Sequence, residues 1–169
     1  AKENGEWQTY STADVKDMVD KLSAGLLQLG VSGNDMVIEN QDKIALVSKN
    51  RPEWLLLDMA CQQIGAALCP VYPTTNINDL DFIFNDASIK YVFVSGQDIL
   101  DKVNNIRDRI PTLKNVYSFD ELPGVDYWKI ILTSATTDTL AKLVNIKAAI
   151  KSEHCATIIY TSGTTGTPK

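Results

Sequence analysis

Chemistry is most readily predicted for the last ten residues of the sequence. Segment 160–169 contains five serine and threonine hydroxyls, two glycines and a final lysine. Glycine lets the backbone curl so that successive N–H groups point into one concavity, and hydroxyls add further donors. A lysine places a full positive charge nearby. Residues 156–160 form a short apolar and β-branched run, which predicts a buried strand. A strand that leads into such a loop predicts a phosphate-binding site.

The spacing of this loop differs from the two commonest phosphate-binding patterns. Gly163 and Gly166 are three positions apart, and Pro168 directly precedes Lys169. The loop therefore matches neither G-x-x-x-x-G-K-[ST] nor G-x-G-x-x-G. Serine, threonine and glycine are also frequent in ordinary surface loops, so composition alone leaves a polar connection without a ligand as the alternative.

The complete pattern of segment 160–169 resembles the phosphate-binding motif of the adenylate-forming superfamily, which includes acyl-CoA synthetases, amino-acid adenylation domains and luciferases. Hydroxyl residues, a glycine, two further hydroxyls, a glycine, a variable residue, a proline and a lysine occur in the family's order. Segments 50–54 and 65–74 resemble the N-terminal region of long-chain fatty acyl-CoA synthetases. The similarity extends from about residue 7 to residue 169 and is weakest between 122 and 153.

The resemblance implies two half-reactions. A fatty acid carboxylate attacks the α-phosphorus of ATP, pyrophosphate leaves and an acyl-adenylate forms; the thiolate of coenzyme A then displaces AMP. Charge gathers on the leaving phosphates in the first step, so hydrogen-bond donors and Mg²⁺ must stabilise it. Pro168 is expected to stiffen the exit of the loop. On the family's pattern the residues that hold the β- and γ-phosphates are Thr161, Ser162, Gly163, Thr164, Thr165, Gly166 and Lys169.

The resemblance also implies that other functional residues lie elsewhere. The adenine, ribose and acid contacts, the Mg²⁺ ligand and a lysine used in adenylation are expected C-terminal to Lys169. Residues 1–169 are thus expected to be an N-terminal fragment of the AMP-binding (adenylation) domain that ends at loop 160–169, with the C-terminal domain absent. We expect this piece alone to be inactive as a ligase. Two alternatives stay open: an adenylate-forming enzyme for another carboxylic acid, and a non-catalytic phosphate-binding or interaction module.

Composition indicates a soluble globular domain. The apolar fraction is 44% and the charged fraction 22%, and the net charge of −5 comes from interleaved acids and bases. A chain without a basic cluster is not expected to bind nucleic acid or an anionic membrane as its main partner. No apolar run approaches the length of a membrane span, and the N-terminus lacks a signal peptide's apolar core. We expect a cytoplasmic protein, and a fatty acid substrate leaves peripheral membrane contact open.

The thiols and the imidazole do not form a recognisable catalytic or metal-binding pattern. Cys61, Cys69 and Cys155 form no C-x-x-C pair, and each lies among apolar residues, which predicts buried free thiols in a reducing compartment. His154 is the single histidine, so a metal site or a Ser–His–Asp triad is not expected from it. We interpret it as a polar residue at the start of the last strand.

Alternation of helical and strand patterns predicts an α/β fold with a mostly parallel sheet covered by helices, an incomplete N-terminal portion of the acyl-CoA synthetase large domain. Ser11 and Asp14 predict a capping box before the first helix, and Gly30 its end. Asn50 is expected to cap a second helix, which is apolar almost all round over 54–64 and is therefore expected between layers. Asn78 is expected to start a third helix. Further helices are predicted over 99–110 and 139–150, and strands over 66–71, 90–94 and 116–119.

One stretch leaves the strand assignment open. Two apolar pieces, 36–38 and 44–47, follow the first helix, and either could pair in the sheet. In the family this region usually runs directly into one strand, so segment 38–43 resembles a local insertion. Since ligands of parallel sheets bind beyond the carboxyl ends of the strands, we expect loop 160–169 to lie at that edge.

Overall fold

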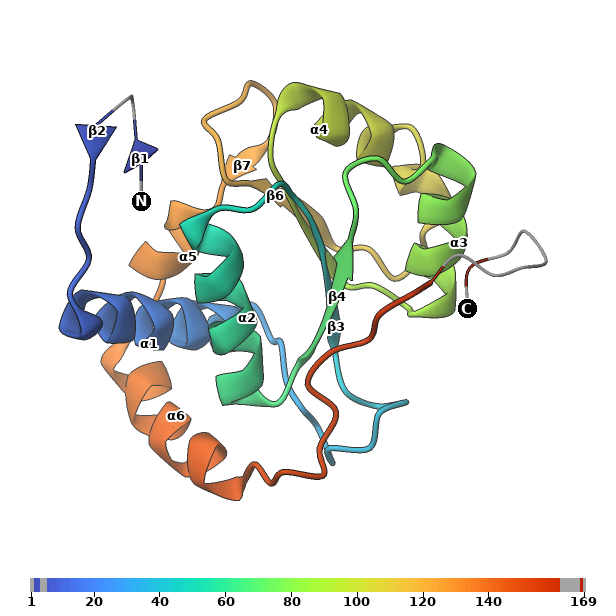
Figure 1. The fold of residues 1–169 in the computed structure, drawn as a ribbon. Helices are drawn as coiled ribbons and strands as arrows, with labels where there is room; N and C mark the ends of the chain where they lie inside the picture. Colours follow the sequence, from blue (N-terminus) through green and yellow to red (C-terminus); the bar gives the residue numbers. More distant parts are fainter. Residues whose placement is uncertain (1, 4–5, 162–167, 169) are drawn as a thin grey trace.

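The structure is a computed structural model that describes residues 2–3, 6–161 and 168. Its centre is a five-stranded sheet in which every neighbouring pair of strands is parallel. The strands lie in the order β4-β3-β5-β6-β7 (Figure 1). The prediction of an α/β fold with a parallel sheet is confirmed. The strands are β3 (Lys43–Val47), β4 (Ala67–Val71), β5 (Tyr91–Val94), β6 (Asn115–Ser118) and β7 (Asp126–Tyr127).

Helices cover both faces of the sheet. One face carries α1, α2, α5 and α6, and the other carries α3 and α4 (Figure 1). A short antiparallel pair, β1 (Lys2–Glu3) with β2 (Glu6–Trp7), precedes α1. The helices are α1 (Thr12–Gln28), α2 (Pro52–Ile64), α3 (Ile77–Asp86), α4 (Gln97–Asn104), a 3₁₀ turn η1 (Arg107–Arg109), α5 (Lys129–Thr133) and α6 (Thr137–Ala149).

The side-chain alternation of the strands divides the interior into two cores. In β3, Ile44 and Leu46 pack under α1 and α2, whereas Ala45 and Val47 pack under α3 and α4. All four side chains are completely buried. A strand buried on both faces needs apolar residues at every position, which explains the continuous apolar runs in the sequence.

Local signals correctly placed the first helix. Ser11 Oγ accepts a hydrogen bond from the Asp14 N–H at 3.1 Å, and the Asp14 carboxylate accepts one from the Ser11 N–H at 2.9 Å. This is the predicted capping box. Gly30 follows the C-cap with a left-handed φ of +78°, which glycine adopts without strain.

The starts of the next two helices were predicted wrongly. Arg51, not Asn50, is the N-cap of α2, because Pro52 occupies the first helical position and forces the preceding residue into an extended conformation. The α3 helix starts at Ile77, one residue earlier than predicted, since Asn76 caps it by accepting a hydrogen bond from the Asp79 N–H at 2.9 Å. Asn78 lies inside its first turn.

The prediction that α2 is buried on almost all sides is also wrong. Leu56 and Leu57 face the core, but Leu55 is 49% exposed and Met59 is 40% exposed. The side of α2 that carries Leu55 and Met59 is thus exposed within the described chain.

The prediction that residues 156–160 form a buried strand is wrong. Residues 156–160 contribute one parallel bridge, between Thr157 and Leu68 of β4. Two backbone hydrogen bonds hold it: the Leu68 N–H donates to Ala156 O at 3.0 Å, and the Ile158 N–H donates to Leu68 O at 2.9 Å. Ile159 is 65% exposed. Within the described part of the chain β4 is an edge strand, so this segment has a sheet neighbour on one side only.

Of the two apolar pieces that follow the first helix, the second forms the strand. Lys43–Val47 is the strand, and segment 36–38 lies in a turn. Segment 38–43 precedes the amino end of β3, on the edge opposite to the start of loop 160–169. There the Gln41 amide donates to Gly65 O at 2.8 Å and to Cys155 O at 2.9 Å. Among the residues described, none of the helices has the length and apolar character needed to cross a membrane.

Candidate functional site

The carboxyl edge of the sheet contains a point at which the order of the strands reverses. From β3 the chain continues to β4 on one side, and later to β5 on the other side. Helix α2 leaves β3 toward one face, and α4 leaves β5 toward the other. Such a switch point opens a crevice beyond the carboxyl ends of the strands, and ligands of doubly wound sheets bind there.

Two serines occupy this switch point. Ser48 directly follows β3 and Ser95 directly follows β5, and their hydroxyl oxygens lie 3.0 Å apart in a hydrogen bond. Ser48 Oγ also lies 2.8 Å from Lys49 O, a second acceptor within its reach. Both side chains are buried. They join the two central strands on the side of the sheet where loop 160–169 begins.

A cavity of about 460 Å³ adjoins the switch point. The carboxyl ends of β3 and β4, the start of α2 and segment 157–160 enclose it. Its lining includes Ser48, Trp54, Asp58, Pro73, Ile83 and Tyr160. The chain enters loop 160–169 along the wall of this cavity.

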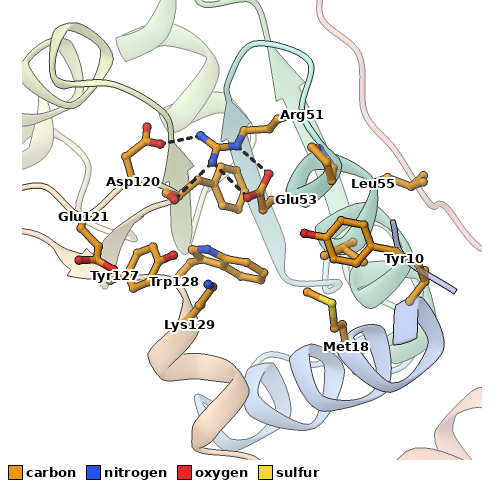
Figure 2. A pocket seen from close by; sticks show the side chains of 14 residues that line it. Tyr10, Met18, Arg51, Glu53, Leu55, Asp120, Glu121, Tyr127, Trp128 and Lys129 are labelled. Atoms are coloured by element: carbon orange, nitrogen blue, oxygen red, sulfur yellow. Dashed lines mark hydrogen bonds and ion pairs between the residues drawn. The ribbon is translucent and has the colours of Figure 1, made fainter. Parts of the chain in front are cut away.

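A second cavity, of about 590 Å³, lies between α1, α2, α5 and the end of β6 (Figure 2). Figure 2 shows the Arg51 guanidinium at its rim, between the carboxylates of Glu53 and Asp120. Arg51 Nε lies 2.8 Å from Glu53 Oε2, and Arg51 Nη1 lies 2.9 Å from Asp120 Oδ1. The guanidinium carbon also lies 5.2 Å from the centre of the Phe119 ring.

The arrangement around Arg51 ties strand ends together. Burial alone would lower the pKa of Arg51, but its hydrogen bonds to the carboxylates of Glu53 and Asp120 outweigh burial and raise the pKa, so the guanidinium stays charged. The other oxygen of Asp120 accepts a hydrogen bond from the Gly96 N–H at 2.8 Å. Arg51 follows β3, Gly96 follows β5 and Asp120 follows β6, so this network fixes three strands at the carboxyl edge. Both carboxylates already neutralise Arg51, which makes it a structural residue here.

The predicted phosphate-binding residues fall almost entirely outside the described chain. Thr161 is described, and it is exposed at the end of the segment that borders the cavity. Pro168 is partly buried. The remaining predicted residues lie outside the described residues: Ser162, Gly163, Thr164, Thr165, Gly166 and Lys169.

The thiols and the histidine show no catalytic arrangement in the described part. Cys61 and Cys69 are buried free thiols as predicted, whereas Cys155 is only partly buried. Burial raises the pKa of Cys69 to about 12, so that its thiol stays protonated. His154 Nδ1 accepts a hydrogen bond from the Lys151 N–H at 3.1 Å in a turn before segment 156–160. The described residues contain no group of three or more His, Cys, Asp or Glu side chains that could hold a metal ion.

Comparison with known proteins decides the family. The model of the AMP-binding enzyme family matches residues 1–169. The chain belongs to this family. A long-chain-fatty-acid–CoA ligase, FadD15 of Mycobacterium bovis, is 28% identical over 166 residues. That match covers 98% of this AMP-binding chain and 26% of the ligase. Long chain acyl-CoA synthetase 3 of Arabidopsis thaliana is 30% identical over 171 residues, with 96% of this chain and 24% of the relative covered. This AMP-binding chain thus spans about a quarter of the length of these relatives.

Solved structures of adenylate-forming enzymes share the fold. The red-emitting luciferase of Phrixothrix hirtus superposes with a TM-score of 0.74 at 18% identity, over 96% of this AMP-binding chain and 30% of the luciferase. The MbtA protein of Mycobacterium smegmatis gives a TM-score of 0.77 at 16% identity, over 97% of this chain and 28% of MbtA. The sheet described above is therefore the N-terminal portion of that larger fold.

Sequence reasoning missed the residues that build the edge around the loop. Ser48, Ser95 and Asp120 each stand within two positions of the end of a predicted strand. A polar side chain directly after a buried apolar run was the available signal, because carboxyl ends of parallel strands gather at one edge.

Proposed function

We propose that this chain is the N-terminal part of an ATP-dependent long-chain fatty acid–CoA ligase, which converts fatty acid, ATP and coenzyme A into acyl-CoA, AMP and pyrophosphate. Membership of the AMP-binding family and the long-chain ligases among its relatives support the reaction class. The observation that carries the proposal is the position of Thr161. The hydroxyl- and glycine-rich loop starts at the carboxyl edge of a parallel sheet, next to the switch point and its cavity.

In this proposal the loop holds the phosphates of ATP. The backbone N–H groups and hydroxyls of 161–166 would hydrogen-bond the β- and γ-phosphates, and Lys169 would neutralise charge beside them. Stronger bonds to the departing pyrophosphate than to bound ATP would lower the barrier to adenylate formation. Mg²⁺ would add to that charge stabilisation, and no described residue is assigned to hold it.

Carboxylate-dependent ATP–pyrophosphate exchange tests the proposal. The polypeptide would be extended to the length of its relatives and assayed with a long-chain fatty acid, with acetate, with an aryl acid and with several amino acids. Exchange that requires the long-chain acid, followed by thioester formation when coenzyme A is added, is the expected result. The 169-residue chain alone is expected to form no thioester, and measurable thioester formation by it would contradict that expectation.

The second candidate is an adenylate-forming enzyme for another acid. An anthranilate CoA ligase superposes with a TM-score of 0.71 at 18% identity, which shows that the same fold serves an aryl acid. Exchange that depends on an aryl or amino acid instead would establish this candidate. Absence of exchange with every acid would leave a phosphate-binding or interaction module.

The cellular location follows from the same proposal. Free thiols that stay reduced fit a cytoplasmic enzyme, since disulfides form in oxidising compartments. A long-chain acid partitions into bilayers, so we expect the enzyme to associate peripherally with membranes that hold its substrate. Co-sedimentation with phosphatidylcholine vesicles, with and without oleate, tests this expectation. Recovery of the enzyme in the supernatant under both conditions would contradict it.

A further inference from the structure

Tyr160, which directly precedes Thr161, is attached to helix α3 by its side chain. The Tyr160 hydroxyl donates a hydrogen bond to the carboxylate of Asp86. The Tyr160 ring also meets the Phe82 ring edge to face, with the ring centres 6.4 Å apart and the planes at 88°. In Figure 1 the C-terminal segment accordingly runs past α3. These contacts join residues that are more than seventy positions apart in the sequence.

Asp86 occupies a position that does not favour helix stability. It is the final residue of α3, where the partial charge of the helix is negative, and the last turn contains no basic residue. A carboxylate at a helix C-terminus is destabilising. Its contact with Tyr160 provides a physical reason for an acidic residue at this end of the helix.

Helix α3 is a firm base for this contact. Leu80, Ile83 and Phe84 bury one face of the helix against the sheet and are each at most 3% exposed. Tyr160 itself packs against the same core. Burial and the Asp86 carboxylate both raise the pKa of Tyr160, so its hydroxyl remains a donor.

Two attachments therefore define the path of the chain into the loop. The backbone of 156–158 is hydrogen-bonded to β4, and two residues later the Tyr160 side chain is held on α3. After the bridge at Thr157 the described chain forms no further ladder with the sheet. The contact of Tyr160 with α3 thus holds the chain where the loop begins.

We propose that Tyr160, Asp86 and Phe82 form a clamp that positions the phosphate-binding loop, and that the three are positioning residues for ATP. This inference rests on the proposed function of the loop. With these contacts in place, the chain enters the loop from a fixed point, Tyr160 in the cavity wall, and this preorganisation contributes to ATP affinity. Without these contacts, part of the binding energy of ATP must fix the position of Tyr160.

The first test is Tyr160→Phe in the polypeptide extended to the length of its relatives. It retains the ring and its contact with Phe82 but removes the hydroxyl. A net hydrogen bond changes an equilibrium constant by roughly 2- to 10-fold. We expect the KM for ATP in pyrophosphate exchange to rise by about that factor, while kcat changes less than about twofold.

Tyr91→Phe is the matched control. Its hydroxyl donates to Leu29 O at 2.9 Å and belongs to the opposite core of the sheet. The control loses a comparable hydrogen bond, so we expect a comparable fall in thermal stability with an unchanged KM for ATP. Equal KM values for the parent and Tyr160→Phe, or equal KM increases in Tyr160→Phe and Tyr91→Phe, would overturn the clamp.

Variants of Asp86 test whether the pair acts as a unit. Asp86→Asn keeps a carbonyl oxygen that can accept from Tyr160, and we expect most of the parent's ATP affinity. Asp86→Ala removes the acceptor and is expected to raise KM as Tyr160→Phe does. The double variant Tyr160→Phe/Asp86→Ala should be no worse than either single variant, because both remove the same bond. Effects that multiply would contradict the coupling.

Hydrogen exchange on the 169-residue chain separates the clamp from the catalytic proposal. We expect Tyr160→Phe to speed exchange of the Ile158 amide about 2- to 10-fold, with the amides of β5 unchanged. Unchanged exchange at Ile158 would overturn the clamp whether or not the enzyme is active. Faster exchange at Ile158 combined with no pyrophosphate exchange by the parent would instead overturn the proposed function and leave the attachment intact.

Discussion

Replacement of Arg51 by methionine should weaken the fold at the carboxyl edge of the sheet. Methionine retains an apolar stem over the Phe119 ring but removes the charge between Glu53 and Asp120. The side chains of Arg51, Glu53 and Asp120 are 23%, 18% and 39% exposed, so these ion pairs are only partly desolvated. Two partly exposed pairs at about 1 kcal/mol each and a cation–π contact of about 0.5–1 kcal/mol give a loss of about 2.5–3 kcal/mol.

Urea unfolding followed by far-UV circular dichroism measures this loss. Arg51→Met should lower the unfolding midpoint without a change in slope, because the native surface stays the same. Arg109→Met is the matched control: Arg109 pairs with Asp81 at 2.8 Å but is 53% exposed, so about 0.5 kcal/mol or less is expected. A loss for Arg51→Met equal to that of the control would refute the view that Arg51 holds the strand ends together.

Three further predictions concern the described core. Cys155 should react with a thiol reagent in the native chain, whereas Cys61 and Cys69 should react only after unfolding because they are completely buried. Equal reaction rates for the three thiols in the native chain would contradict this prediction. A Cβ at Gly25 would lie 2.0 Å from a backbone oxygen of α5, so Gly25→Ala should lower the melting temperature despite the better helix propensity of alanine. Burial raises the pKa of Asp20, but two lysine ammonium groups outweigh burial and lower the pKa below 3.8. The stability lost in Asp20→Asn should therefore be largest near neutral pH and should vanish as the pH falls below 3.8, because the carboxylate of the parent is then protonated. A stability difference that stays constant with pH would contradict this prediction.

Features determined by near neighbours in the sequence were predictable. The Ser11 capping box needs only the four residues that form it, and it was found where the pattern indicated. The parallel sheet followed from apolar runs that are long enough for strands but separated by helical patterns. The start of α2 was misplaced by one residue because Asn50 is the better capping residue, whereas Pro52 decides which residue precedes the helix.

Features determined by distant neighbours were not predictable. Whether residues 156–160 are buried depends on how many strands flank them, and an apolar run does not reveal that number. Helix α5 and the short strand β7 lie in the stretch where the resemblance is weakest. Their position depends on the packing of Trp128 and Ile131 against α1, which is distant in the sequence. The hydrogen bond between Tyr160 and the carboxylate of Asp86 joins residues 74 positions apart, and no local pattern in the sequence indicates it.

The measurement that tests the central claim most directly is the effect of loop substitutions on pyrophosphate exchange. Lys169→Ala and Thr165→Ala would be compared with Lys151→Ala, which removes an exposed lysine outside the loop. The account predicts that both loop variants lose at least about tenfold in kcat/KM for ATP, as expected when a charge-assisted contact to phosphate is removed. Lys151→Ala should match the parent. Loop variants with the parent's kcat/KM would contradict the claim that this loop binds the phosphates of ATP.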